Sequence, residues 1–85
     1  MTVREEEFLS NIKYSIGNYN CRIESHYETM WDGKYFTVLI WLNDEEWCDY
    51  HKRVWDSLDE VARSEGANMD DEGNHCIGLS IKVED

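Results

Sequence analysis

The sequence of 85 residues contains no proline, and its eight lysine and arginine residues are outnumbered by 19 aspartate and glutamate residues. Because proline is absent, every residue in the predicted helices and strands has a backbone N–H that can donate a hydrogen bond. No apolar run approaches the roughly 20 residues that a membrane-spanning helix needs. The acidic start MTVREEEFLS has no apolar segment, so we expect no signal peptide.

Sequence motifs of catalysis are also missing. The chain has no glycine-rich phosphate loop, no GxSxG and no HExxH. Glu24, His26 and Glu28 alternate along one predicted strand, so a carboxylate would orient the imidazole, but no nucleophile accompanies them. We therefore expect that the protein is not an enzyme.

The three cysteines have unrelated spacings and form no CxxC pair. Without an export signal, we expect reduced thiols and a cytoplasmic location in the producing or infected cell. Cys48 lies three residues before His51, and His75 precedes Cys76, but a zinc site needs four converging ligands. Neighbours on a strand point to opposite faces. We expect no metal site and no cofactor.

What the sequence does contain is bulky core material. Hydrophobic residues make up 41%, and four Trp, five Tyr and two Phe are among them. This composition is typical of a globular protein, and the length suits one domain over residues 1–85.

The formal net charge of −11 is unevenly distributed. Residues 1–42 hold six acids and four bases, whereas residues 43–85 hold thirteen acids and four bases. Such a chain is repelled by nucleic acid and by anionic membranes and is attracted to basic surfaces. We therefore expect a basic protein as partner, and neither direct nucleic-acid binding nor a membrane.

Two segments have helical periodicity. Residues 2–17 begin with a capping box of Thr2 and Glu5 and end near Gly17, and residues 43–66 begin with Asn43 and Glu46 and end at Gly66. The first segment has its apolar residues at Phe8, Leu9, Ile12, Ile16 and Tyr19. The second has a continuous stripe of Trp47, His51, Val54, Trp55, Leu58, Val61 and Ala62.

Residues 21–42 predict a β-hairpin. The Asp32–Gly33 pair favours a two-residue type I′ turn, which places Trp31 opposite Lys34 and makes the numbers of opposite residues sum to 65. One face of this hairpin is the core face. The other carries large apolar groups, which are Met30, Tyr35, Leu39 and Trp41, rimmed by Glu24, His26 and Glu28.

That second apolar face is the main functional signal, because one face of a small sheet is normally wet. Three explanations fit it: a partner protein covers it, a second copy covers it, or the first helix covers it. Aromatic residues and methionine are enriched in interface cores, with a polar rim. We favour a different protein as the partner.

The end of the chain predicts an acidic turn over residues 67–74 and a final strand over residues 75–85. That strand lies beside the first strand, antiparallel to it, or beside the second through a right-handed crossover. The predicted fold is an α+β domain in the order helix, strand, strand, helix, strand. Its two helices pack on a three-stranded antiparallel or mixed sheet.

The acids of the second half make up the rest of the candidate partner-binding surface, through Asp49, Asp56, Glu60, Asp70, Asp71 and Glu72. Carboxylates about 5–6 Å apart on a helix resemble the spacing of nucleic-acid phosphates. Against this, Lys52, Arg53 and Arg63 are placed to form i,i+4 pairs with Asp49, Asp56 and Glu60, which is typical of a solvated face.

The sequence thus predicts a small acidic inhibitor that occupies a basic, nucleic-acid-binding surface of a target protein. Phage anti-defence proteins and DNA mimics work in this way as classes, although no motif identifies a family. The alternatives are a homo-oligomeric structural module, an immunity or antitoxin-type protein, and a small enzyme that uses His26.

Overall fold

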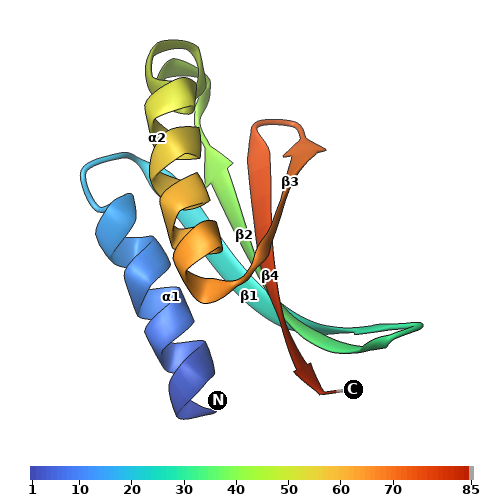
Figure 1. The fold of residues 1–85 in the computed structure, drawn as a ribbon. Helices are drawn as coiled ribbons and strands as arrows, with labels where there is room; N and C mark the ends of the chain where they lie inside the picture. Colours follow the sequence, from blue (N-terminus) through green and yellow to red (C-terminus); the bar gives the residue numbers. More distant parts are fainter. Residues whose placement is uncertain (85) are drawn as a thin grey trace.

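Two helices lie against the same face of a four-stranded antiparallel sheet in the computed structural model, which describes residues 1–84 (Figure 1). The elements follow one another as α1 (Val3–Ser15), β1 (Cys21–Met30), β2 (Gly33–Leu42), α2 (Asp44–Glu65), β3 (Asn68–Gly73) and β4 (Cys76–Glu84). The strand order in the sheet is β1-β2-β4-β3. The predicted α+β class is confirmed, whereas the predicted three-stranded sheet is wrong by one strand. Neither described helix combines the length and hydropathy needed to cross a bilayer.

Helix α1 begins with the predicted capping box. The Thr2 hydroxyl oxygen accepts a hydrogen bond from the Glu5 backbone N–H at 3.2 Å and donates one to the Glu5 carboxylate at 3.0 Å. The Glu5 N–H in the first turn has no partner within the helix, and the Thr2 hydroxyl supplies one. Phe8, Ile12 and Ile16 are buried on one side of the helix, as their spacing predicts.

Helix α2 has the predicted limits. The Asn43 side chain accepts a hydrogen bond from the Glu46 N–H at 2.7 Å, and Gly66 ends the helix with φ of 67°. A positive φ suits glycine, which has no Cβ to clash. Of the predicted stripe, Val54, Leu58, Val61 and Ala62 are buried. Trp47 and Trp55 are half-buried, whereas His51 is exposed.

The hairpin of β1 and β2 has its predicted faces but not its predicted register. Met30 pairs with Gly33, so the loop residues are Trp31 and Asp32 and opposite residues sum to 63. Neither loop residue has a positive φ, so the predicted type I′ turn at Asp32–Gly33 is wrong. Because side chains alternate with a period of two, a shift of two residues keeps every side chain on its predicted face.

Residues predicted as an acidic turn form the edge strand β3 instead. Acidic residues are depleted in strands, but β3 is an edge strand, where charged side chains are common. The turn lies at Asn74 and His75, which have φ of 51° and 62°. This additional strand reverses the chain, so β4 lies beside β2 and antiparallel to it. Of the two predicted positions for the last strand, the one beside β1 is wrong and the one beside β2 is confirmed. The parallel crossover is wrong, because β4 is antiparallel to β2.

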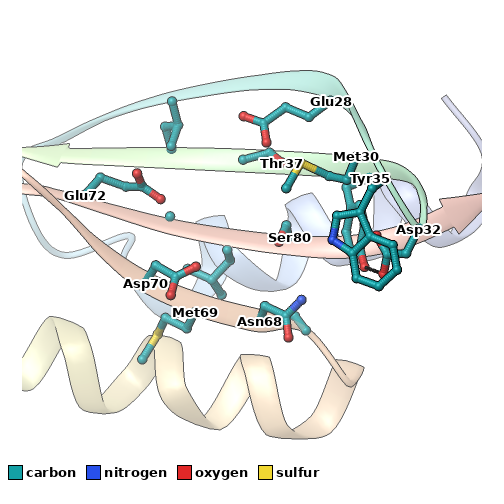
Figure 2. A pocket seen from close by; sticks show the side chains of 15 residues that line it. Glu28, Met30, Asp32, Tyr35, Thr37, Asn68, Met69, Asp70, Glu72 and Ser80 are labelled. Atoms are coloured by element: carbon teal, nitrogen blue, oxygen red, sulfur yellow. Dashed lines mark hydrogen bonds between the residues drawn. The ribbon is translucent and has the colours of Figure 1, made fainter.

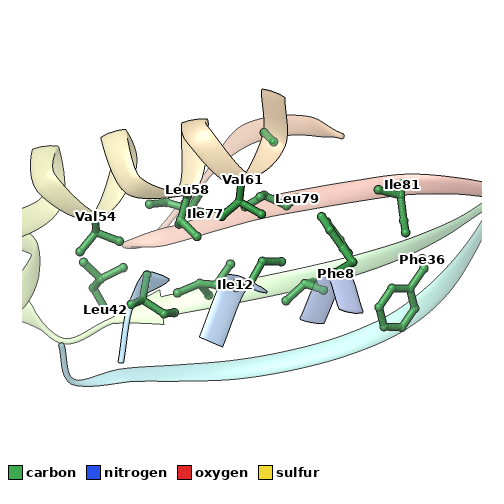
Figure 3. Close-up of a cluster of buried hydrophobic side chains, with 14 residues drawn as sticks. Phe8, Ile12, Phe36, Leu42, Val54, Leu58, Val61, Ile77, Leu79 and Ile81 are labelled. Atoms are coloured by element: carbon green, nitrogen blue, oxygen red, sulfur yellow. The ribbon is translucent and has the colours of Figure 1, made fainter. Parts of the chain in front are cut away.

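The core lies between the helices and the sheet (Figure 3). Phe8 of α1 lies between Ile12 of the same helix and Phe36 of β2, and Leu58 of α2 lies above Ile77 of β4. The Phe8 and Phe36 rings make an edge-on contact with centroids 6.4 Å apart. Apolar burial between these two layers is the main force that holds the domain together.

One charged group is buried beside this core. Glu5 is 2% exposed, and its carboxylate accepts hydrogen bonds from the Tyr27 hydroxyl of β1 and from Thr2. The bond from Tyr27, with those from Thr2, lowers the pKa of Glu5 against the opposing effect of burial. The same bond raises the pKa of the Tyr27 hydroxyl. The pair ties α1 to the edge strand β1.

Candidate functional site: the open face of the sheet

The sheet face opposite the helices is covered by no described element, and we call it the open face (Figure 1). Because both helices pack on the other face, the alternative that the first helix covers the apolar hairpin residues is wrong. Tyr35, Thr37, Leu39 and Trp41 of β2 alternate along this face, since they lie two residues apart on one strand.

The middle of the open face is hollowed because β4 contributes small residues there. Gly78 lies opposite Leu39, and Ser80 lies opposite Thr37. A groove results that is lined by residues of all four strands and of the Trp31–Asp32 turn (Figure 2). Thr37 is only 6% exposed at the bottom of this groove, and its hydroxyl has no hydrogen-bond partner within residues 1–84. A buried polar group without a partner calls for an explanation, such as a bound water or ligand group.

Carboxylates flank the groove from both sides. Glu28 projects from β1, whereas Asp70 and Glu72 project from β3, on the other side of the two central strands (Figure 2). The Glu72 side chain lies across Gly78, where an added Cβ would be 2.7 Å from its Oε1 atom. Glycine at position 78 therefore lets this carboxylate lie over the sheet.

The apolar side chains of β2 on the open face are held by polar contacts at both ends of their row. At one end the Arg22 guanidinium lies 4.4 Å from the centroid of the Trp41 ring, a cation–π contact. At the other end the Tyr35 hydroxyl donates a hydrogen bond to Asp32 at 2.8 Å, and Lys82 lies 3.9 Å from the same carboxylate. Leu39 is left as the apolar residue in the middle of the face.

The structure brings together eight of the twelve predicted partner-binding residues. These are Glu24, Glu28, Met30, Tyr35, Leu39, Trp41, Asp70 and Glu72, on the open face. The predicted partner-binding residues do not include Thr37, Gly78 and Ser80, which the pairing of β2 with β4 brings into one groove. The one local signal that could have indicated a hairpin there is the Gly73–Asn74 step before the last strand.

The other four predicted residues lie elsewhere. Asp49, Asp56 and Glu60 are on α2, and Asp71 lies opposite the core residue Ile77, on the helix side of the sheet. The predicted i,i+4 pairing is confirmed for Lys52, which lies 3.5 Å from Asp56.

Arg63 pairs with Asp59, at 3.0 Å, and not with the predicted Glu60. Exposed pairs of this kind contribute little to stability. The acids of α2 are therefore partly neutralised by their own helix and form no continuous surface with the groove.

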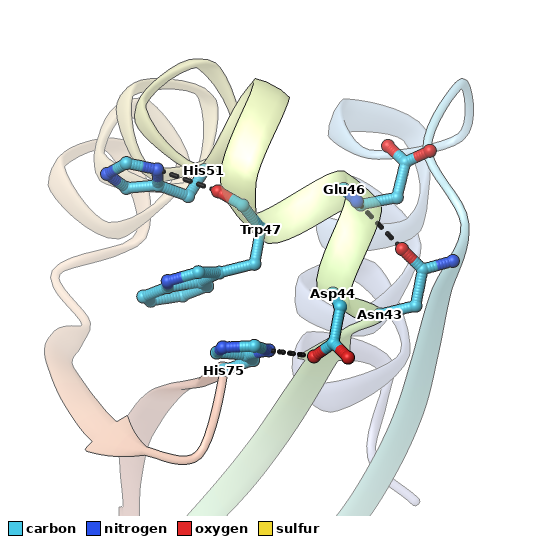
Figure 4. A network of polar contacts seen from close by, with 6 residues as sticks. All are labelled: Asn43, Asp44, Glu46, Trp47, His51 and His75. Atoms are coloured by element: carbon cyan, nitrogen blue, oxygen red, sulfur yellow. Dashed lines mark hydrogen bonds and ion pairs between the residues drawn. The ribbon is translucent and has the colours of Figure 1, made fainter.

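A separate polar network lies where α2 begins (Figure 4). The Trp47 indole is stacked between the imidazoles of His51 and His75, with ring centroids 5.1 and 4.9 Å away. His51 Nδ1 lies 2.8 Å from the Trp47 carbonyl oxygen, and His75 Nδ1 lies 3.2 Å from the Asp44 carboxylate. The indole thus keeps the two imidazoles apart, and the network holds the β3–β4 turn against the helix.

Cys21 and Cys76 do not have the environment of reactive thiols. Cys76 is buried opposite Trp41, and burial raises the pKa of its thiol, as does the nearby charge of Glu72. Burial likewise raises the pKa of Cys21. A nucleophilic or metal-binding cysteine needs a lowered pKa. Within residues 1–84, no three His, Cys, Asp or Glu side chains are placed to hold a metal ion.

On the open face the His26 imidazole interacts with the Glu28 carboxylate. Its Nε2 atom lies 2.7 Å from Glu28 Oε1, and both side chains are partly exposed. The pair has the geometry of an oriented imidazole, but within the described chain no Ser or Cys nucleophile contacts it. Its position on the rim suits a role in recognition.

Comparison with known proteins gives no relative: no protein-family model matches the sequence, and no curated protein matches it.

Proposed function

We propose that the protein binds a basic segment of another protein in the groove of the open face. The observation that carries this proposal is the combination of an apolar centre, an unpaired buried hydroxyl at Thr37, and carboxylates on both flanks. Apolar centres with charged rims are typical of protein interfaces. The carboxylates select lysine or arginine and speed encounter, while Leu39 supplies apolar contact.

The class of target follows from charge. A chain with a net charge of −11 is attracted to surfaces that normally hold nucleic-acid phosphates. We propose that binding there excludes nucleic acid from a cytoplasmic nucleic-acid-handling protein, as phage anti-defence inhibitors and DNA mimics do. The acids of α2, which lie outside the groove, would act through long-range attraction alone.

The experiment is capture of proteins from host lysate on the immobilised protein, with matched variants. Glu28→Lys combined with Glu72→Lys reverses both flanks of the groove, and Asp49→Lys combined with Asp56→Lys makes the same charge change on α2. We expect the first variant to lose the target and the second to retain it with slower association. The captured protein is then tested for displacement of bound DNA or RNA.

Three outcomes contradict the proposal. Equal losses of target capture in both variants would show that the groove contributes nothing beyond general charge attraction. A target that binds nucleic acid and the inhibitor simultaneously would rule out occlusion. Recovery of nothing but copies of the same chain, abolished by Trp41→Glu, would favour the homo-oligomeric alternative.

A salt series separates charge from apolar contact. We expect Trp41→Ala to weaken binding with little change in its salt dependence, because the indole contributes apolar area. The flank reversal should instead flatten the salt dependence, because screening acts on the removed charges.

A further inference from the structure

The two edges of the sheet differ in how well they are protected against pairing with another strand. The β3 edge is six residues long, has an irregular register at Asp71 and Gly73, and carries three consecutive acids. Short strands, bulges and charges are the usual protection of an edge. The β1 edge is ten residues long and pairs with β2 without any shift of register. It has none of these protections except alternating charge.

The side chains of β1 are complementary to a second copy of themselves. An antiparallel pair of two β1 strands, centred on Ser25, places Arg22 opposite Glu28 and Glu24 opposite His26. Both oppositions occur twice, because a two-fold axis repeats them. On the helix side of the sheet, Ile23 then lies opposite Tyr27.

The two nearest registers place like charges opposite each other, and registers centred on Ile23 or Tyr27 give one kind of unlike-charge opposition instead of two. Centring the pair on Glu24 places this acid opposite its own copy, and centring it on His26 places Glu24 opposite Glu28. Like charges directly opposite each other on a sheet are destabilising. Registers centred between two residues would place helix-side residues opposite open-face residues, which the alternation of the strand forbids.

Contacts within the single chain prepare this arrangement. Arg22 lies 3.9 Å from Glu24, and His26 lies 2.7 Å from Glu28. Across the two-fold axis, each basic group would lie between two carboxylates, one from its own strand and one from the other copy. On the helix side, the 46%-exposed Tyr27 ring would be covered by Ile23 of the second copy.

We propose that two copies of the chain associate through their β1 edges, antiparallel and centred on Ser25. The product is a continuous eight-stranded sheet with the helices of both copies on one face and a shared open face on the other. The backbone N–H and C=O groups of the edge supply the hydrogen bonds, and the charge pattern selects the register. This proposal does not rest on the function proposed above.

The test is sedimentation equilibrium of charge-reversed variants at physiological ionic strength. Arg22→Glu places Glu opposite Glu28, and Glu28→Arg places Arg opposite Arg22. We expect each variant alone to raise the dissociation constant of the dimer at least about tenfold, because two symmetry-related oppositions become repulsive. An equimolar mixture of the two variants should form a heterodimer about as tight as the original dimer, because every opposition is again between unlike charges.

Matched controls carry the same charge changes on α2. Arg53→Glu and Asp49→Arg, alone or mixed, should leave the dimer unchanged. Far-UV circular dichroism confirms that each variant is folded.

Some results would overturn the proposal. These are a monomer at every concentration up to high micromolar, a mixture that does not restore association, or a dimer that is insensitive to both edge variants. A dimer abolished by Leu39→Glu and not by the edge variants would place the contact on the open face instead.

Discussion

The two faces of the sheet are built from the same strands, yet they have different roles. On the helix side, Phe36, Val38 and Ile40 of β2 are at most 2% exposed. On the open side, Leu39 and Trp41 of the same strand remain partly exposed. The covered face provides stability through buried area. The open face keeps apolar and charged groups available for another molecule, and the comparison teaches that the two roles can be separated by mutation.

The largest expected effect comes from truncating one leucine on each face. Leu79→Ala, on the covered face, should lower the free energy of unfolding by about 2–5 kcal/mol, because it leaves a cavity in the core. Leu39→Ala, in the open groove, should cost about 0.5–1 kcal/mol. Urea unfolding followed by circular dichroism measures both.

Equal losses in the free energy of unfolding for Leu79→Ala and Leu39→Ala would contradict the proposed difference between the two faces. They would show that the open face is covered in solution, by a second copy or by another segment. The dimer at the β1 edge predicts no such equality, since it leaves Leu39 uncovered.

A smaller effect is expected for the buried charge that joins α1 to β1. Tyr27→Phe removes the largest cause of the lowered pKa of Glu5. A carboxyl whose pKa is lowered on folding stabilises the protein above its unfolded value of 4.5, and this contribution is lost as the pH falls through the folded value. The variant should therefore be less stable at neutral pH and lose less of its stability on acidification.

The measurement is the free energy of unfolding of both proteins from pH 7 down through the acid range, where the difference between the two curves should shrink. Tyr35→Phe is the matched control, because it removes a tyrosine hydroxyl from the open face. Parallel curves for Tyr27→Phe and the original protein would show that Glu5 does not carry this pH dependence.

An effect of the opposite sign is expected at the bottom of the groove. Thr37→Val replaces the unpaired buried hydroxyl at the bottom of the groove with a methyl group of similar size. Removing an unsatisfied polar group should raise the free energy of unfolding by about 1 kcal/mol. The same change should weaken capture of the target, because the groove loses its buried polar partner.

A variant that is more stable and binds normally would show that the hydroxyl has no part in recognition. A variant that is less stable would show that the hydroxyl is paired in solution. Ser80→Ala, on the neighbouring strand, controls for a general effect of hydroxyl removal in the groove.

The candidate surface was only partly predictable from the sequence. The apolar groups of β2 and the acids of β1 were predictable as one face, because side chains alternate along a strand whatever the register. The contribution of Asp70 and Glu72 to the same groove was not predictable, because the strand that carries them has no apolar pattern. Because side chains alternate along a strand, Asp71, which lies between them in the sequence, faces the helix side.

The sequence by itself determined what depends on near neighbours along the chain. It determined the limits of α2 through Asn43 and Gly66, the start of α1 through Thr2, the two faces of the hairpin and the excess of acid. Caps and side-chain alternation act within a few residues. Only the tertiary structure decided the hairpin register, the formation of β3 and the place of β4 beside β2. Those features depend on contacts between distant segments, such as Tyr27 with Glu5, whose strength no local pattern records.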